Sequence, residues 1–306
     1  MVGKALVVLL AAISAYSVSD ANACEGTTLN NVGGVTRVLK LKNSGVAAYA
    51  KMNVNIDGYG RAYHPENRKA GAVLHLCNAG KVVLPDGSSY HGSESNATCT
   101  GKFMEDFHKI RAAGWNDPSV GAINWYGVLG KGSVNIADKS VKSVKPVEVS
   151  DGSGFFVSPT ALADPTIKNP DDQARYVSPL KVPSAVAPEG IKQYGVLMGS
   201  FGVAIHRTRK IAVPFVVGDR GPKIGEGSVA LARLAAGLRL KDTISQSDRF
   251  AGQVSEADVL WVFFADQPQN FDSKNQESTL DRASAAFEKW GGVTKLLTCF
   301  DSVPRN

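Results

Sequence analysis

The chain lacks the residue spacings that bind metals or carry redox and nucleophilic chemistry. Its five histidines form neither an H-x-H nor an H-E-x-x-H pattern, and its four cysteines form no C-x-x-C pair. These absences argue against a metal site, and nothing else in the sequence predicts a cofactor. A G-x-S-x-G motif is also missing, so catalysis by a Ser-His-Asp triad has no local support.

Repeats and dense runs of charge are missing too. We find no internal repeat, heptad pattern or low-complexity tract, which excludes solenoids and coiled coils. The formal net charge is +6, but lysine and arginine are scattered along the chain rather than grouped. The sequence therefore does not predict a nucleic-acid partner. The positive charge also argues mildly against a strongly cationic polymer as substrate, because like charges repel.

No segment after the first residues approaches eighteen consecutive apolar residues, so no membrane-spanning helix is predicted there. The start is typical of a secretory signal peptide. Lys4 precedes an apolar run from Ala5 to about Ile13, and Ala21-Asn22-Ala23 fits an A-x-A cleavage site. We therefore expect residues 1–23 to be removed and the mature protein to be exported, to the periplasm or the medium. Lipid attachment at Cys24 is the alternative.

The four cysteines are an even set in a chain that is expected to leave the reducing cytoplasm. Two disulfides are the natural interpretation, and three connectivities are possible. We favour a bond between Cys77 and Cys99, which closes a loop, and one between Cys24 and Cys299, which joins the chain ends. Free thiols are the alternative.

The pattern of apolar residues predicts a mainly β, or β-rich α+β, protein. Runs rich in valine, isoleucine and aromatic residues are typical of strands, and they cover Gly45–Asn55, Ala72–Leu76, Gly154–Val157, Tyr194–Ile205, Ile211–Val217 and Val259–Ala265. Helical spacing that stops at a glycine predicts helices over Phe103–Ala113, Ser228–Ala236 and Thr279–Trp290. Long loops are expected over residues 137–150 and 158–189. Strands with few helices favour a barrel-like domain.

The stretch from Tyr194 to Gly237 carries the candidate chemistry. Two consecutive predicted strands lead into a loop with four glycines, which a helix follows. Asp219 stands at the end of the second strand and Glu226 near the start of the helix, so two carboxylates frame one short bend. Glycoside hydrolysis by inversion needs one protonated and one ionised carboxyl group about 6.5–9.5 Å apart. A looped separation of seven residues can reach that span.

Simpler interpretations of this loop stay open. An aspartate after glycine at a strand end is commonly a turn former, and a glutamate at a helix start commonly complements the helix dipole. A glycine loop before a helix can also bind an anion. Against that alternative, Lys223 is not followed by serine or threonine as in the phosphate-binding motif.

The same residues resemble a family signature. The stretch from Gly218-Asp219 through Gly225-Glu226-Gly227-Ser228-Val229-Ala230-Leu231-Ala232 is similar to the G-D-x-(loop)-G-E-x-S-(apolar)-A-L-A pattern of the fungal-type chitosanases, glycoside hydrolase family 75. Asp151–Pro159, Tyr176–Leu180 and Ala257–Val262 also fit that family. The resemblance covers about residues 51–266.

This resemblance implies a six-stranded, double-psi β-barrel-like core within a single domain that spans residues 24–306. It also implies an exported, monomeric glycosidase that cleaves β-1,4 linkages in chitosan or a related amino-sugar polysaccharide by inversion. Glu226 would be the general acid and Asp219 the general base. The alternatives are a hydrolase of another cell-wall glycan and a barrel that binds polysaccharide without cleaving it.

Three further residues are candidates for substrate contact. Asp57 is expected at the rim of a cleft, with a turn role as its alternative. Arg220 follows the candidate base, and Tyr176 is a candidate platform for stacking a sugar ring. The chain departs from the family at Asn53-Val54-Asn55-Ile56-Asp57-Gly58, where many members have D-x-D-C-D-G. Amides replace two acids there, which weakens the case for chitosan in particular.

Overall fold

The computed structural model describes residues 8–9, 24–42, 45–92, 96–265 and 268–305. The predicted signal peptide lies outside the described residues except for β1 (Val8–Leu9), which pairs antiparallel with β12 (Ile211–Arg220). Within these ranges no helix has the length and apolar character needed to cross a membrane.

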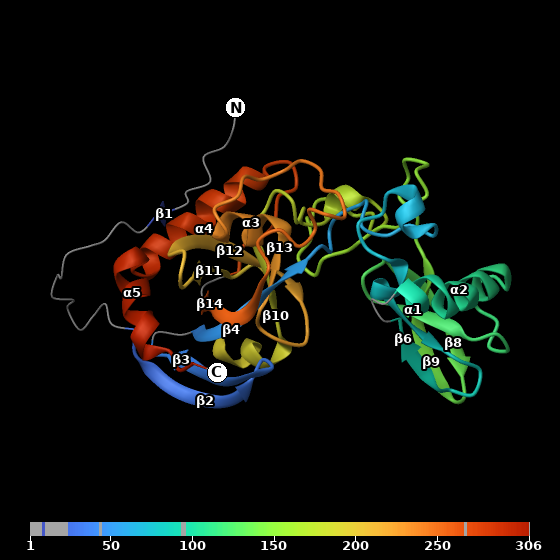
Figure 1. Ribbon diagram of the computed structural model, residues 1–306, viewed down its shortest axis with the longest axis horizontal. Coiled ribbons are helices and arrows are strands. Elements are labelled where there is room, and N and C mark those ends of the chain that lie inside the picture. Colours follow the sequence, from blue (N-terminus) through green and yellow to red (C-terminus); the bar gives the residue numbers. More distant parts are fainter. Residues whose placement is uncertain (1–7, 10–23, 43–44, 93–95, 266–267, 306) are drawn as a thin grey trace.

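A closed barrel of six strands forms the larger body of the molecule (Figure 1). Around the barrel the strands follow the order β4 (Gly45–Asn55), β13 (Glu226–Ser228), β10 (Ser184–Ala187), β12, β11 (Phe201–His206) and β14 (Val254–Phe264). Strand β14 then pairs with β4 and closes the ring. The pairs β10–β12 and β13–β4 are parallel, whereas the other four are antiparallel. The predicted mainly β fold with a barrel-like core is confirmed.

The long barrel strands are apolar on both faces, which explains their continuous hydrophobic runs. One face carries a cluster in which the Phe215 ring lies 5.2 Å from that of Phe263 and 5.8 Å from that of Trp261. The opposite face packs against two C-terminal helices, α4 (Gln276–Trp290) and α5 (Gly292–Ser302). The core of the barrel therefore continues outward beneath these helices.

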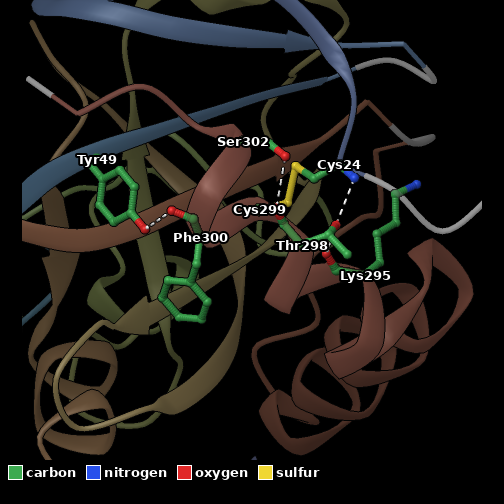
Figure 2. Close-up of a disulfide and its surroundings, with 7 residues drawn as sticks. All are labelled: Cys24, Tyr49, Lys295, Thr298, Cys299, Phe300 and Ser302. Carbon is green, nitrogen blue, oxygen red and sulfur yellow. Dashed lines mark hydrogen bonds between the residues drawn. A yellow bond between two sulfur atoms is a disulfide. The ribbon is translucent and has the colours of Figure 1, made fainter. Parts of the chain in front are cut away.

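Both predicted disulfides are present, Cys24–Cys299 and Cys77–Cys99. The first joins Cys24, two residues before the antiparallel ribbon β2 (Gly26–Val32) and β3 (Val35–Leu41), to helix α5 (Figure 2). Because the Cys24 sulfur is bonded to Cys299, no thiol is left there for a lipid thioether. The lipid-attachment alternative is therefore wrong for this state of the chain.

A smaller lobe is inserted between β4 and β10 and stands beside the barrel (Figure 1). It contains a three-stranded sheet, a two-stranded ribbon and two helices. Their bounds are β5 (Gly80–Val83), β6 (Ser89–His91), α1 (Asn96–Thr100), α2 (Lys102–Ala112), β7 (Ala122–Trp125), β8 (Gly130–Ile136) and β9 (Lys139–Pro146). The hydrophobic cluster of this lobe includes Leu180 and Val229, so it is continuous with the barrel side.

Several predicted elements differ from the structure. Ala72–Leu76 is a turn that leads into a 3₁₀ helix (Leu76–Ala79), and residues 154–157 form only an isolated bridge. Both segments are apolar because they fill the core of the small lobe rather than because they pair in a sheet. Conversely, strand β9 lies in the predicted loop 137–150, and strand β10 interrupts the predicted loop 158–189.

Candidate active site

Asp219 and Glu226 are held at the ends of two barrel strands. Asp219 is the penultimate residue of β12, and Glu226 is the first residue of the short strand β13. Strand β13 lies parallel to β4, so Glu226 stands opposite Asn53 and Ser228 opposite Asn55. The fold therefore brings the glycine loop against residues that are more than 160 positions earlier in the sequence.

The loop geometry depends on Gly225. Its φ is +116°, and a Cβ placed there would lie 3.0 Å from the Lys51 carbonyl oxygen. A side chain at this position would therefore be strained and crowded. The Gly225 carbonyl accepts a hydrogen bond of 2.8 Å from the Asn53 N–H, which locks the residue before Glu226 onto β4.

Ser228 fixes the end of the same loop. Its hydroxyl accepts the Leu231 N–H at 3.2 Å, which caps helix α3 (Val229–Ala235), and it donates to the Val182 carbonyl at 2.9 Å. The Ser184 N–H also donates to this hydroxyl at 2.9 Å. The serine of the signature thus holds β13, β10 and α3 together behind Glu226.

The Asp219 carboxylate accepts three hydrogen bonds. The donors are the Arg220 N–H at 2.9 Å, the Ala161 N–H at 3.0 Å and the Asn55 Nδ2 at 3.2 Å. Burial raises the pKa of Asp219, whereas these three donors lower it. Hydrogen bonds of this kind favour the ionised carboxylate.

Glu226 has a different environment. No hydrogen bond to its carboxylate is formed within the described part of the chain, and a Cβ placed at Gly221 would lie 3.9 Å from its Oε2 atom. Burial raises the pKa of Glu226; Lys223 and Lys51 lower it, and the nearby Asp219 charge raises it. Without donors to stabilise its anion, this carboxyl group keeps its proton more readily than an exposed glutamate does.

Asp57 joins this pair as a third acidic group. The Tyr63 hydroxyl donates to its Oδ1 at 3.4 Å, and its own N–H donates to the Asn55 Oδ1 at 2.7 Å. Burial raises the pKa of Asp57 well above its usual range, and the charges of Asp219 and Glu226 raise it further. Because two nearby carboxylates resist ionising together, this raised pKa favours the protonated form of Asp57 beside Asp219.

A cleft of about 530 Å³ opens at this group. Its lining residues come from the end of β4, the start of β13, the small lobe and the loop before β14. They are Asn53, Val54, Asn55, Ile56, Asp57, Tyr63, Leu74, Asn78, Glu226, Phe250 and Gln253. Asp219 is joined to this wall through Asn55, whose amide binds it. The cleft therefore has two carboxyl groups on its wall and a third held behind one of its amides.

The structure places the three residues predicted to contact substrate in different environments. Asp57 lies in the cleft, and Arg220 is exposed on the strand end next to Asp219. Tyr176 is only 6% exposed and donates its hydroxyl to the Pro170 carbonyl at 2.7 Å. Its ring is part of the loop packing and is not presented to a ligand, so the prediction of a stacking platform at Tyr176 is wrong.

Sequence reasoning did not identify Asn55 and Phe250, which shape the site together with Tyr63. Asn55 was noted only as a departure from the family pattern, although it contacts both Asp57 and Asp219. Tyr63 is buried against Asp57, and Phe250 lines the cleft with 38% of its surface exposed. Phe250 lies in an irregular segment without periodicity, so no local pattern could have identified it.

The chain matches no protein-family model and no curated protein. Within the described residues, no group of three or more histidine, cysteine, aspartate or glutamate side chains is arranged to hold a metal ion.

Proposed function

We propose that the chain is a glycosidase similar to the fungal-type chitosanases, which hydrolyses the β-1,4 bonds of an amino-sugar polysaccharide by inversion. One observation carries the proposal: Asp57 and Glu226 line one cleft and Asp219 binds the wall amide Asn55, so that three acidic side chains lie at one site in environments that differ in hydrogen bonding. Pairs of carboxyl groups with separated pKa values are the basis of acid–base catalysis on sugars. The two disulfides support export to an oxidising compartment.

In this proposal Glu226 is the general acid. It lines the cleft, and burial raises its pKa, so it holds a proton to donate to the leaving glycosidic oxygen. Asp219 is the general base, because three N–H donors stabilise its anion. It takes a proton from the water that attacks the anomeric carbon from the opposite side. After one turnover the glutamate is ionised and the aspartate is protonated, and exchange with solvent restores both.

Asp57 has a supporting role. Its raised pKa keeps it protonated, so it presents a hydrogen-bond donor rather than a second negative charge beside Asp219. A neutral Asp57 can donate to a sugar hydroxyl in the cleft. It also leaves the general base as the ionised member of the pair.

The direct test is the release of reducing ends from chitosan, peptidoglycan and β-glucan by the purified mature chain. We expect cleavage of at least one amino-sugar polymer, and none by the double variant Asp219→Asn, Glu226→Gln. A folded double variant with unchanged rates would contradict the assignment. Retained pull-down of the polymer without cleavage by the unaltered chain would instead identify a binding protein.

Asn55 provides a test of the base through the pH dependence. The variant Asn55→Asp replaces an amide donor by a carboxylate, which raises the pKa of Asp219. Because the base acts only when ionised, activity is lost as the pH falls through that pKa. We expect the acid limb of the pH–rate profile to move up by about one pH unit, with kcat largely kept on the alkaline side.

The matched control is Asn53→Ala. Asn53 lies two residues earlier on the same face of β4, but it stands opposite Glu226. Its loss should leave the acid limb where it is. An unshifted limb in Asn55→Asp would show that this amide does not set the ionisation of the base.

A further inference from the structure

The chemistry of the cleft wall indicates which sugar units it can accept, provided that the proposed function holds. Apart from Asp57 and Glu226, the polar side chains on the wall are amides and one phenol. The amides are Asn53, Asn55, Asn78 and Gln253. An amide offers both a donor and an acceptor without charge, so this wall suits hydroxyl and N-acyl groups.

Positive charges surround the catalytic glutamate. Lys223 and Lys51 both act electrostatically on Glu226. The Cγ atom of Lys51 lies 3.6 Å from the position that a Cβ at Gly225 would occupy, directly before the glutamate. A cationic sugar amine bound beside Glu226 would therefore be repelled by two ammonium groups that act on the same carboxyl group.

A third cation lies at the rim. The Arg249 guanidinium is 4.4 Å from the centroid of the Phe250 ring, and Phe250 lines the cleft. A half-exposed phenylalanine suits the C–H face of a sugar ring. The stacked arginine adds a positive charge next to that surface, which again disfavours a cationic unit.

Asp57 on the wall does not offer a full negative charge to a cation. Burial raises its pKa well above the usual range, which favours its neutral form, and its Oδ1 accepts the Tyr63 hydroxyl. A protonated carboxyl group needs an acceptor on the ligand, and an ammonium group offers none. An N-acyl carbonyl or a hydroxyl oxygen does accept.

We propose that the cleft binds uncharged sugar units, N-acylated amino sugars or plain hexoses, in preference to the free-amine units of chitosan. Lys51, Lys223 and the amides of the wall are the groups that set this preference. It differs from the expectation that the family resemblance gives, and it follows from the amides Asn53 and Asn55 on the cleft wall.

The test compares kcat/KM on chitosans of increasing N-acetylation, on a soluble fully N-acetylated polymer and on a soluble β-1,4-glucan. We expect kcat/KM to rise at least about tenfold from the least to the most acetylated chitosan. The glucan arm distinguishes the two uncharged classes. The highest kcat/KM on the least acetylated chitosan would overturn this preference while leaving the proposed function intact. Cleavage of no amino-sugar polymer would overturn the proposed function itself.

A charge variant tests the effect of the cleft wall on substrate preference. Gln253→Glu adds an acid to an exposed position of the wall, and Gln193→Glu makes the same change on an exposed residue elsewhere. We expect the first to raise the relative kcat/KM on free-amine chitosan roughly threefold, in line with the modest strength of exposed charge pairs, and the second to leave it unchanged. Equal behaviour of the two variants would contradict the role given to the wall.

Discussion

Glu226→Gln is expected to lower kcat on a polysaccharide by about 10³-fold, the usual size of a general-acid contribution. The glutamine has nearly the same shape as the glutamate but carries no proton that it can transfer to the leaving oxygen. Its effect should be small on an oligosaccharide with a dinitrophenyl leaving group, because that group departs without protonation. The measurement is kcat for both substrates with the same purified variant.

Asp219→Asn should show the opposite pattern. Loss of the base slows both substrates by about 10³-fold, since water must be activated in each case. Added azide should restore part of the rate, because it is a nucleophile that needs no base. Glu256→Gln, an exposed change on β14, is the control and should keep native rates on both substrates.

The two patterns separate the roles. Equal losses on both substrates in both variants would contradict the division into acid and base, although the pair would remain essential. Restoration of Glu226→Gln by azide, with none for Asp219→Asn, would exchange the two assignments. The three hydrogen bonds to Asp219 and the absence of described donors to Glu226 favour the division proposed here.

The barrel strands could be predicted because they are buried on both faces. The predicted range Gly45–Asn55 coincides with strand β4, and Ile211 begins both the predicted and the observed strand β12. Their apolar runs come from packing beneath α4 and α5 on one side and into the barrel on the other. Such apolar runs therefore indicate that a segment is buried, and they do not show whether it pairs in a sheet.

The errors in the small lobe follow from the same rule. Val73 and Leu76 are fully buried but belong to a turn and a 3₁₀ helix, so their apolar character was mistaken for a strand. Strand β9 has the reverse pattern. Its lysines are exposed, and only Val141, Val144 and Pro146 face inward, which made its composition typical of a loop.

Only the part of the site that lies within one short segment of the sequence could be predicted. Asp219 and Glu226 share one loop, so a single segment identified both as candidates. Asn55 reaches Asp219 across 164 positions, through the parallel pairing of β13 with β4. That pairing is a property of the closed barrel, and no spacing along the chain encodes it. Tyr176 was misplaced for a related reason, since loop packing decides which aromatic rings are exposed.

The Cys24–Cys299 disulfide should make the larger contribution to stability. It joins residues 275 positions apart, whereas Cys77–Cys99 joins residues 22 apart. A cross-link restricts the unfolded chain more when it closes a longer loop. We expect Cys24→Ala, Cys299→Ala to lower the free energy of unfolding by about 5 kcal/mol, and the alanine pair at Cys77 and Cys99 to lower it by about 3 kcal/mol. Urea unfolding of the mature chain measures both.

Hydrogen bonds of the folded chain lie close to this disulfide. The Cys24 N–H donates to the Thr298 hydroxyl at 2.7 Å, and the Tyr49 hydroxyl on β4 donates to the Phe300 carbonyl at 3.2 Å (Figure 2). The disulfide therefore secures helix α5 to the barrel at a point where hydrogen bonds already hold it. The cross-link restricts the unfolded chain, in which these native hydrogen bonds are absent, so its loss should appear as a lower free energy of unfolding. Equal losses for the two alanine pairs would show that loop length does not govern the stability of this barrel.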